Sequence, residues 1–167
     1  MRQDIRLGEG VRVPGIDACL DEAMALPGAR GAAVVDWTSG LALGTAGEPP
    51  GGDQEAAAAE TAELARAAAE LPTFTPDAWD GAAPGPGVGG GAGAGAGSGG
   101  GNGAAGGKGL PVEDVIVSTR DGYHVLCFVD TTFDSSVFLH LWLDRDTGNL
   151  ALARIRVRQL AERLVLG

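Results

Sequence analysis

Two histidines and two cysteines are the side chains of this sequence best suited to metal binding or nucleophilic catalysis. His124 and His140 lie on separate apolar segments that we expect to be neighbouring strands, so their rings can face each other. A zinc site needs a third and usually a fourth ligand. Cys127 is the nearest further candidate, but because side chains alternate along a strand it falls on the opposite face from His124. We therefore interpret both histidines as half-buried strand residues.

Two glycine-rich motifs resemble phosphate-binding sequences, but neither meets all the requirements of such a site. Gly85-x-Gly87-x-x-Gly90 matches the dinucleotide-binding pattern, but no expected strand precedes it and no expected helix follows it. Gly107-Lys108 resembles the end of a P-loop, yet Asn102 replaces its first glycine and Gly109 replaces the Ser or Thr that would bind magnesium. We therefore expect no catalytic residue, no cofactor and no metal, and a protein that is not an enzyme.

The charge of the chain excludes two broad classes of partner. The formal net charge is −10 at pH 7, with 22 acidic and 12 basic side chains. Nucleic acids and anionic membranes attract Lys and Arg, so neither is expected as a partner. No apolar run is long enough to cross a bilayer, and residues 1–10 lack the apolar core of a secretory signal. We expect a cytoplasmic protein without membrane insertion, in which Cys19 and Cys127 are buried thiols.

Hydrophobic periodicity predicts three helices and five strands. The helices begin at Pro14, at Gln54 after the capping residue Asp53, and at Leu150. The expected strands are residues 32–35, 41–45, 112–119, 123–129 and 137–143. The order α-β-β-α-β-β-β-α indicates an α+β sandwich, in which three helices cover a five-stranded antiparallel, meander-like sheet.

The expected sheet and the second helix both carry apolar surface that another element or a second subunit is expected to bury. The strand at 123–129 is apolar on both faces, whereas an antiparallel sheet usually leaves one face polar. Both faces therefore need cover, from helices or from a second subunit. The second helix carries a stripe of small and apolar residues that allows close approach to another surface. The stripe consists of Ala57, Thr61, Leu64, Ala68 and Leu71.

A glycine-rich tract divides the chain. Of the 29 glycines, 16 fall within residues 81–109, and such a tract cannot bury enough apolar surface to offset the entropy of ordering it. We therefore expect a flexible N-terminus at 1–13, a single domain made of 14–72 and 111–167, and a disordered insertion at 73–110. If free, the ends of that insertion would lie about 30–35 Å apart. Phe74 and Trp79, near its start, are either a short docking peptide or a frayed helix end.

Three segments carry a resemblance to a known family. They are AAVVDWTSGLAL at 32–43, EAAAAETAELARAAA at 55–69 and FLHLWLDRDTGNLALARIRVRQL at 138–160. In this order they resemble the first hairpin, the alanine-rich second helix, and the last strand and helix of the roadblock/dynein light chain family, in its bacterial single-domain form. The resemblance covers residues 14–71 and 111–166, and the glycine-rich insertion departs from it.

The resemblance implies a roadblock/profilin-like fold and a homodimer. In the family, the strand equivalent to residues 112–119 pairs with its two-fold mate, and the second helix packs beside the mate's second helix. The dimer interface implied for this chain consists of Ala57, Thr61, Leu64, Ala68, Val112, Val115 and Val117.

Members of this family act as adaptors and as regulators of Ras-like small GTPases, and are not known for catalysis. The resemblance therefore implies a non-enzymatic homodimeric adaptor that binds such a GTPase or an associated signalling complex. Trp37 in the hairpin turn, and Arg154 and Arg158 on the last helix, are our candidate partner contacts. The alternatives are a Trp37 packed on its neighbours and arginines on a solvated helix face. The alternative function is a small-molecule sensor domain of profilin-like or PAS-like type.

Overall fold

A computed structural model describes residues 14–74, 110–130 and 136–166 of the chain. Its helices are α1 (Pro14–Met24), α2 (Gln54–Glu70) and α3 (Leu150–Leu166), with short 3-10 helices η1 (Pro50–Gly52) and η2 (Pro72–Phe74). Its strands are β1 (Ala29–Asp36), β2 (Leu41–Gly47), β3 (Asp114–Ser118), β4 (Gly122–Val129) and β5 (Val137–Asp144). This is the predicted order of elements. No helix in the described part is long and apolar enough to span a bilayer.

The five strands form one antiparallel sheet in the order β2-β1-β5-β4-β3. The predicted α+β class and five-stranded sheet are confirmed, but the meander-like order is wrong. The chain crosses one face of the sheet as α2 between β2 and β3, so these two strands end at opposite edges. β5 then lies in the centre, between β1 and β4. β2 and β3 are the two edge strands.

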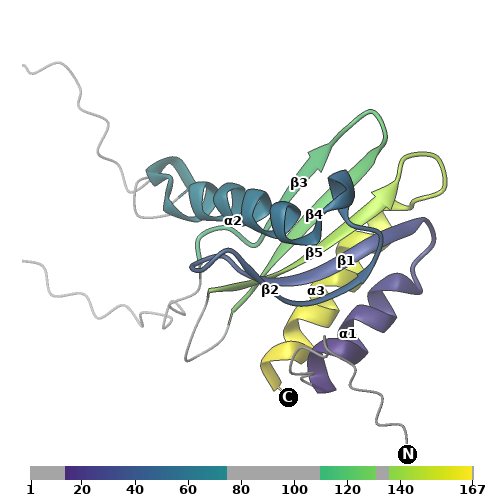
Figure 1. Ribbon diagram of the computed structural model, residues 1–167. Coiled ribbons are helices and arrows are strands. Elements are labelled where there is room, and N and C mark those ends of the chain that lie inside the picture. The colour runs from purple at the N-terminus through teal and green to yellow at the C-terminus, as the bar shows by residue number, and fades with distance from the viewer. Residues whose placement is uncertain (1–13, 75–109, 131–135, 167) are drawn as a thin grey trace, which may run out of the picture.

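Helices cover both faces of the sheet, as Figure 1 shows. On one face, α1 and α3 bury a cluster around Val125, Leu141 and Val157. On the other face, α2 buries a second cluster around Leu126 and Phe138. The prediction that β4 is apolar on both sides is therefore confirmed, since its alternate residues enter different clusters.

α2 lies close to the sheet because its buried side is made of alanine. Asp53 caps the helix, accepting hydrogen bonds from the backbone N–H of Glu55 at 2.9 Å and of Ala56 at 3.1 Å. Pro72 follows the C-cap Leu71 and cannot continue the helix. The buried positions of α2 are Ala57, Ala58, Ala62, Ala65 and Ala68. Such small side chains fill only a shallow layer, so they leave room for the rings of the sheet.

Gly31 of β1 permits another close approach. A Cβ at this position would lie 2.1 Å from the backbone carbonyl oxygen of Glu48, which no side-chain movement relieves. We predict that Gly31→Ala lowers the free energy of unfolding by about 2 kcal/mol or more, as overpacking does elsewhere. Urea denaturation measures this effect. Gly15→Ala in α1 is the control, because a Cβ there meets nothing within 4 Å, and equal stability of the two variants would contradict the packing.

Candidate functional site

The two histidine rings lie against each other on neighbouring strands, as predicted, and the structure places them on the α2 face of the sheet. His124 Nδ1 lies 3.1 Å from His140 Nε2, and the two rings stack with their centroids 5.3 Å apart. The indole of Trp142 also stacks on the ring of His124, and the guanidinium of Arg30 lies 3.8 Å from the centre of that indole. His140 is buried, whereas His124 is half-buried. Across the described ranges, no group of three or more His, Cys, Asp or Glu residues is placed to hold a metal ion.

Burial favours the uncharged forms of the histidines and of the two cysteines. It lowers the pKa of His140 to about 3, helped by the neighbouring His124, and it lowers the pKa of His124 as well. Both cysteines are free thiols in the core, as predicted, and burial raises the pKa of each to about 11. A thiol must ionise to act as a nucleophile, so neither Cys19 nor Cys127 is activated. The geometry makes the histidine pair a part of the core.

An apolar groove runs between α2 and β3, and we call it the α2–β3 groove. It is open to solvent, has a volume of about 580 Å³, and is lined mostly by apolar side chains. Three of these are large and unusually exposed: Leu64 is 39% exposed, Leu71 46% and Phe74 50%. The lining residues are Leu64, Ala67, Ala68, Leu71, Phe74, Pro111, Val112, Asp114 and Val115.

The groove gathers four of the seven residues predicted for a dimer interface: Leu64, Ala68, Val112 and Val115. Val117 lies on the same face of β3, half-buried and opposite His124. Ala57 is buried, and the half-buried Thr61 donates from its hydroxyl to the carbonyl of Ala57 at 2.7 Å. The predicted stripe therefore turns partly inward, and Leu64, Ala68 and Leu71 are its residues that line the groove. Sequence reasoning did not assign Ala67, Phe74 and Pro111 to this surface.

Residues from both sides of the glycine-rich tract line this groove. Phe74 is the last described residue before the tract and Pro111 lies just after it, yet both line the same groove. The expected separation of about 30–35 Å applies to a free chain. Trp79 and residues 75–109 lie outside the described part, as do residues 1–13.

β3 borders the groove and forms an edge of the sheet. Among the described residues it pairs only with β4, so one side of its backbone has no strand partner. Val115 faces the α2 side with Leu126, whereas Ile116 faces the α3 side with Val125 and is 37% exposed. Proteins commonly guard such an edge with charge or proline. Within β3, the only charged residue is Asp114, and the other four residues are uncharged.

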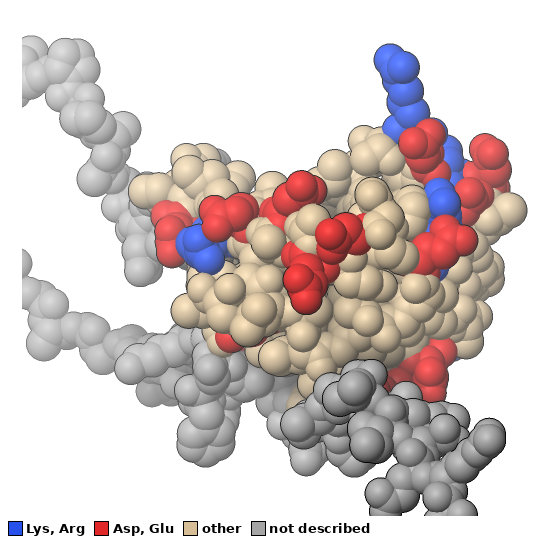
Figure 2. All heavy atoms as spheres, viewed as in Figure 1, with Lys and Arg blue, Asp and Glu red and all other residues tan. Residues whose placement is uncertain are grey.

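The outer side of α2 is acidic. Four glutamates are exposed along it: Glu55, Glu60, Glu63 and Glu70. Arg66 is the one basic residue of the helix, and it pairs with Glu63 at 2.9 Å. Figure 2 shows these acids gathered over the face of the molecule that α2 forms.

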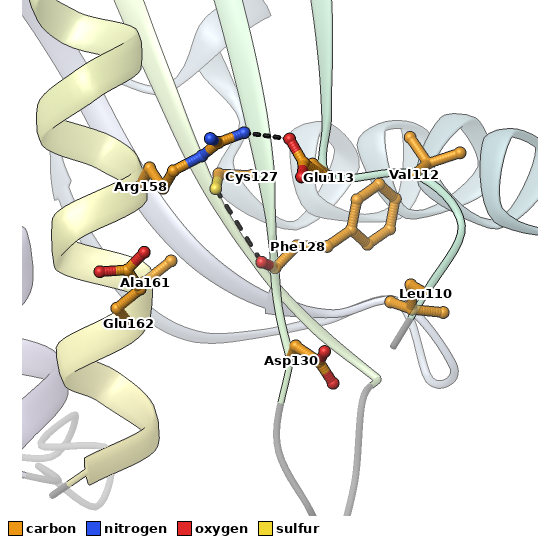
Figure 3. A pocket seen from close by; sticks show the side chains of 9 residues that line it. All are labelled: Leu110, Val112, Glu113, Cys127, Phe128, Asp130, Arg158, Ala161 and Glu162. Carbon is orange, nitrogen blue, oxygen red and sulfur yellow. Dashed lines mark hydrogen bonds and ion pairs between the residues drawn. The ribbon is translucent and has the colours of Figure 1, made fainter. Parts of the chain in front are cut away.

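The three candidate partner contacts are all engaged within the chain. Trp37 is half-buried and packs edge-on against Phe128, with ring centroids 6.5 Å apart, and its carbonyl accepts a hydrogen bond from Arg66 at 2.8 Å. Arg154 pairs with Asp114 at 2.8 Å, and Arg158 pairs with Glu113 (Figure 3). Each of these residues is partly exposed, but each also makes contacts within the chain.

Beneath α2, the described residues leave little room for a small molecule. The cavity between α2 and the sheet, lined by His140, Gln54 and Ala58 among others, has a volume of about 10 Å³, which is scarcely room for one water. A larger hollow of about 470 Å³ is open to solvent between α3 and the end of β4 (Figure 3). The space beneath α2 is therefore filled by side chains.

Several solved structures share this architecture. MglB of Myxococcus xanthus superposes with a TM-score of 0.62 at 17% identity, over 96% of this chain and 92% of that one. A structure described as MglB with a tetrameric arrangement gives 0.60 at 15% identity, over 93% and 91%. A roadblock/LC7 domain from Streptomyces avermitilis gives 0.51 at 14% identity, over 90% and 91%. No protein-family model and no curated protein matches the sequence. The chain has the roadblock/LC7 fold.

The histidine pair makes the stability of the fold depend on pH. His140 has a lowered pKa of about 3 in the folded chain against an ordinary 6.5, so below pH 6.5 the unfolded chain binds a proton that the folded chain does not. We predict full stability above pH 6.5 and a loss that grows as the pH falls towards 3. Between pH 7 and pH 5 the loss from this residue is about 2 kcal/mol. Urea denaturation at both pH values measures it, and His140→Gln should show a smaller difference. The same difference in both proteins would contradict this origin.

Proposed function

We propose that this chain is a non-enzymatic, homodimeric adaptor or regulator that binds a small Ras-like GTPase or an associated signalling complex. The main observation in support of this proposal is the α2–β3 groove, an exposed apolar surface beside an open strand edge. These are the two elements through which the resemblance to the roadblock family implies self-association. The likeness to MglB, one of whose structures is described as tetrameric, supports the same proposal.

In the proposed dimer, self-association buries the exposed apolar surface of the groove. Two-fold pairing of β3 with the β3 of a second copy satisfies the free backbone groups of both strands. Antiparallel pairing centred on Ile116 keeps all five residues of the strand paired and sets Val115 opposite Val117 of the second copy, so apolar side chains meet. The second copy's α2 then covers Leu64 and Leu71.

The dimer presents its partner with a two-fold surface built on the outer sides of both α2 helices. In each copy this side carries four exposed glutamates, so it favours a partner with basic side chains at the contact. The mechanism we propose is positional, in that contacts with the switch loops of the GTPase favour one of their conformations. No residue of the chain takes part in bond making. The two free thiols are consistent with action in the reducing cytoplasm.

The proposed dimer predicts that one charge in the groove separates the two copies. Leu64→Glu buries an unpaired carboxylate in the interface, so we expect the dimer dissociation constant to rise by about a hundredfold or more. Sedimentation velocity over a concentration series measures it. Ala59→Glu, an exposed α2 position that does not line the groove, is the control and should dimerise like the wild type. A monomeric wild-type chain at micromolar concentration would refute the dimer.

The proposed partner predicts nucleotide-dependent capture. Native co-purification from the source cells, with GDP and with a non-hydrolysable GTP analogue, should recover a small GTPase preferentially with one nucleotide. Mass spectrometry identifies it. A blank in both conditions from a folded protein would argue against a GTPase partner. A thermal-shift screen with nucleotides and metabolites tests the alternative sensor function, which predicts a rise in melting temperature with one of them.

A further inference from the structure

The edge strand β3 begins at Asp114, four residues after Leu110, where the second described segment starts. It has five residues, and of its neighbours only β4 pairs with it among the described residues. A short edge strand of this kind tends to fray from its free end. Contacts at its first residue therefore add to the ladder with β4 in fixing its position.

Two arginines of α3 hold that first residue. Asp114 accepts a hydrogen bond from Arg154 Nε at 2.8 Å, and Arg158 Nη2 lies 3.9 Å from the same carboxylate. Arg158 also pairs with Glu113, the residue before β3, as Figure 3 shows. Arg154 and Arg158 are four positions apart, one turn of α3, so both reach the same end of the strand. We call these four residues the arginine clamp.

The clamp differs from an ordinary surface ion pair. The side chain of Asp114 is only 12% exposed, whereas those of Arg154 and Arg158 are 52% and 44% exposed. Exposed pairs contribute little, but a largely buried carboxylate that loses its cation keeps the cost of its burial. The hydrogen bond to Asp114 also raises the pKa of Arg154. The clamp therefore joins two elements that are 40 residues apart in the chain.

We propose that the arginine clamp positions β3 for pairing with the β3 of a second copy, so that Arg154 and Arg158 set the affinity of the dimer without contacting the other subunit. The inference rests on the proposed homodimer. It gives the two arginines a role as positioning residues in place of the partner contacts expected from the sequence. It also makes dimerisation sensitive to salt, because salt screens the exposed arginines from the carboxylate.

The test compares Asp114→Asn and Arg154→Gln with a matched control. Arg156→Gln removes one positive charge from the same helix, at a residue whose guanidinium hydrogen bonds to Gln159 and not to β3. We expect the dimer dissociation constant to rise about tenfold in each clamp variant and to stay unchanged in the control, by sedimentation velocity at low salt. Removing either partner breaks the same pair, so the double variant Asp114→Asn, Arg154→Gln should be little worse than either single one.

Two further readouts separate positioning from general stability. At high salt the wild-type dimer should weaken towards the clamp variants, while the variants themselves change less. Hydrogen exchange should speed up in the amides of β3 and remain unchanged in those of β1 and β5. A lower melting temperature with an unchanged dissociation constant would overturn the inference, as would equal weakening by Arg156→Gln. Dimers of wild-type strength in every variant would refute the clamp and leave the homodimer standing, whereas a monomeric wild type would refute both.

Discussion

The fold depends on one constraint, namely that its central sheet is apolar on both faces. α1 and α3 together bury one of these faces. On the other face a single helix, α2, packs mainly over β1, β2 and the ends of β4 and β5. The alanines that let α2 lie close to the sheet also limit how far it covers that face. The uncovered remainder, between α2 and β3, is the α2–β3 groove, so the candidate interface follows directly from how the core is built.

Local sequence patterns were sufficient to predict the elements. The spacing of apolar residues located all three helices and five strands, and the Asp53 cap marked the start of α2. The order of strands was not predictable in the same way, because the pairing of β1 with β5 joins residues about a hundred positions apart. The α+β class follows from the order of elements, but the central place of β5 follows from packing.

The candidate site, too, was predictable from the sequence only in part. The sequence indicated an interface on α2 and on the strand after the insertion, and four of the seven residues proposed for it line one groove. Phe74 and Pro111 line the same groove although they are separated by the glycine-rich tract in the sequence, so only the folded chain shows that they belong to it. For Arg154 and Arg158 of α3 the sequence indicated partner contacts or a solvated helix face, since nothing in their own neighbourhood points to β3. Their carboxylate partners precede them by 40 and 45 residues, so only the folded chain reveals the pairing.

α2 brings the proposed functions together, because its three sides differ in chemistry. Its buried alanines pack on the sheet, Leu64 and its C-cap Leu71 line the groove, and its glutamates face solvent. If dimerisation buries these leucines, it also sets two acidic helix sides at a fixed separation. A partner that contacts both helices binds only the dimer, and by mass action it then stabilises the dimer in turn. Any residue that shifts β3, including those of the arginine clamp, therefore alters partner affinity through the population of dimer. Under this proposal, dimerisation and partner binding are thermodynamically coupled. Partner binding can therefore be regulated through the dimer without any change in the acidic surface.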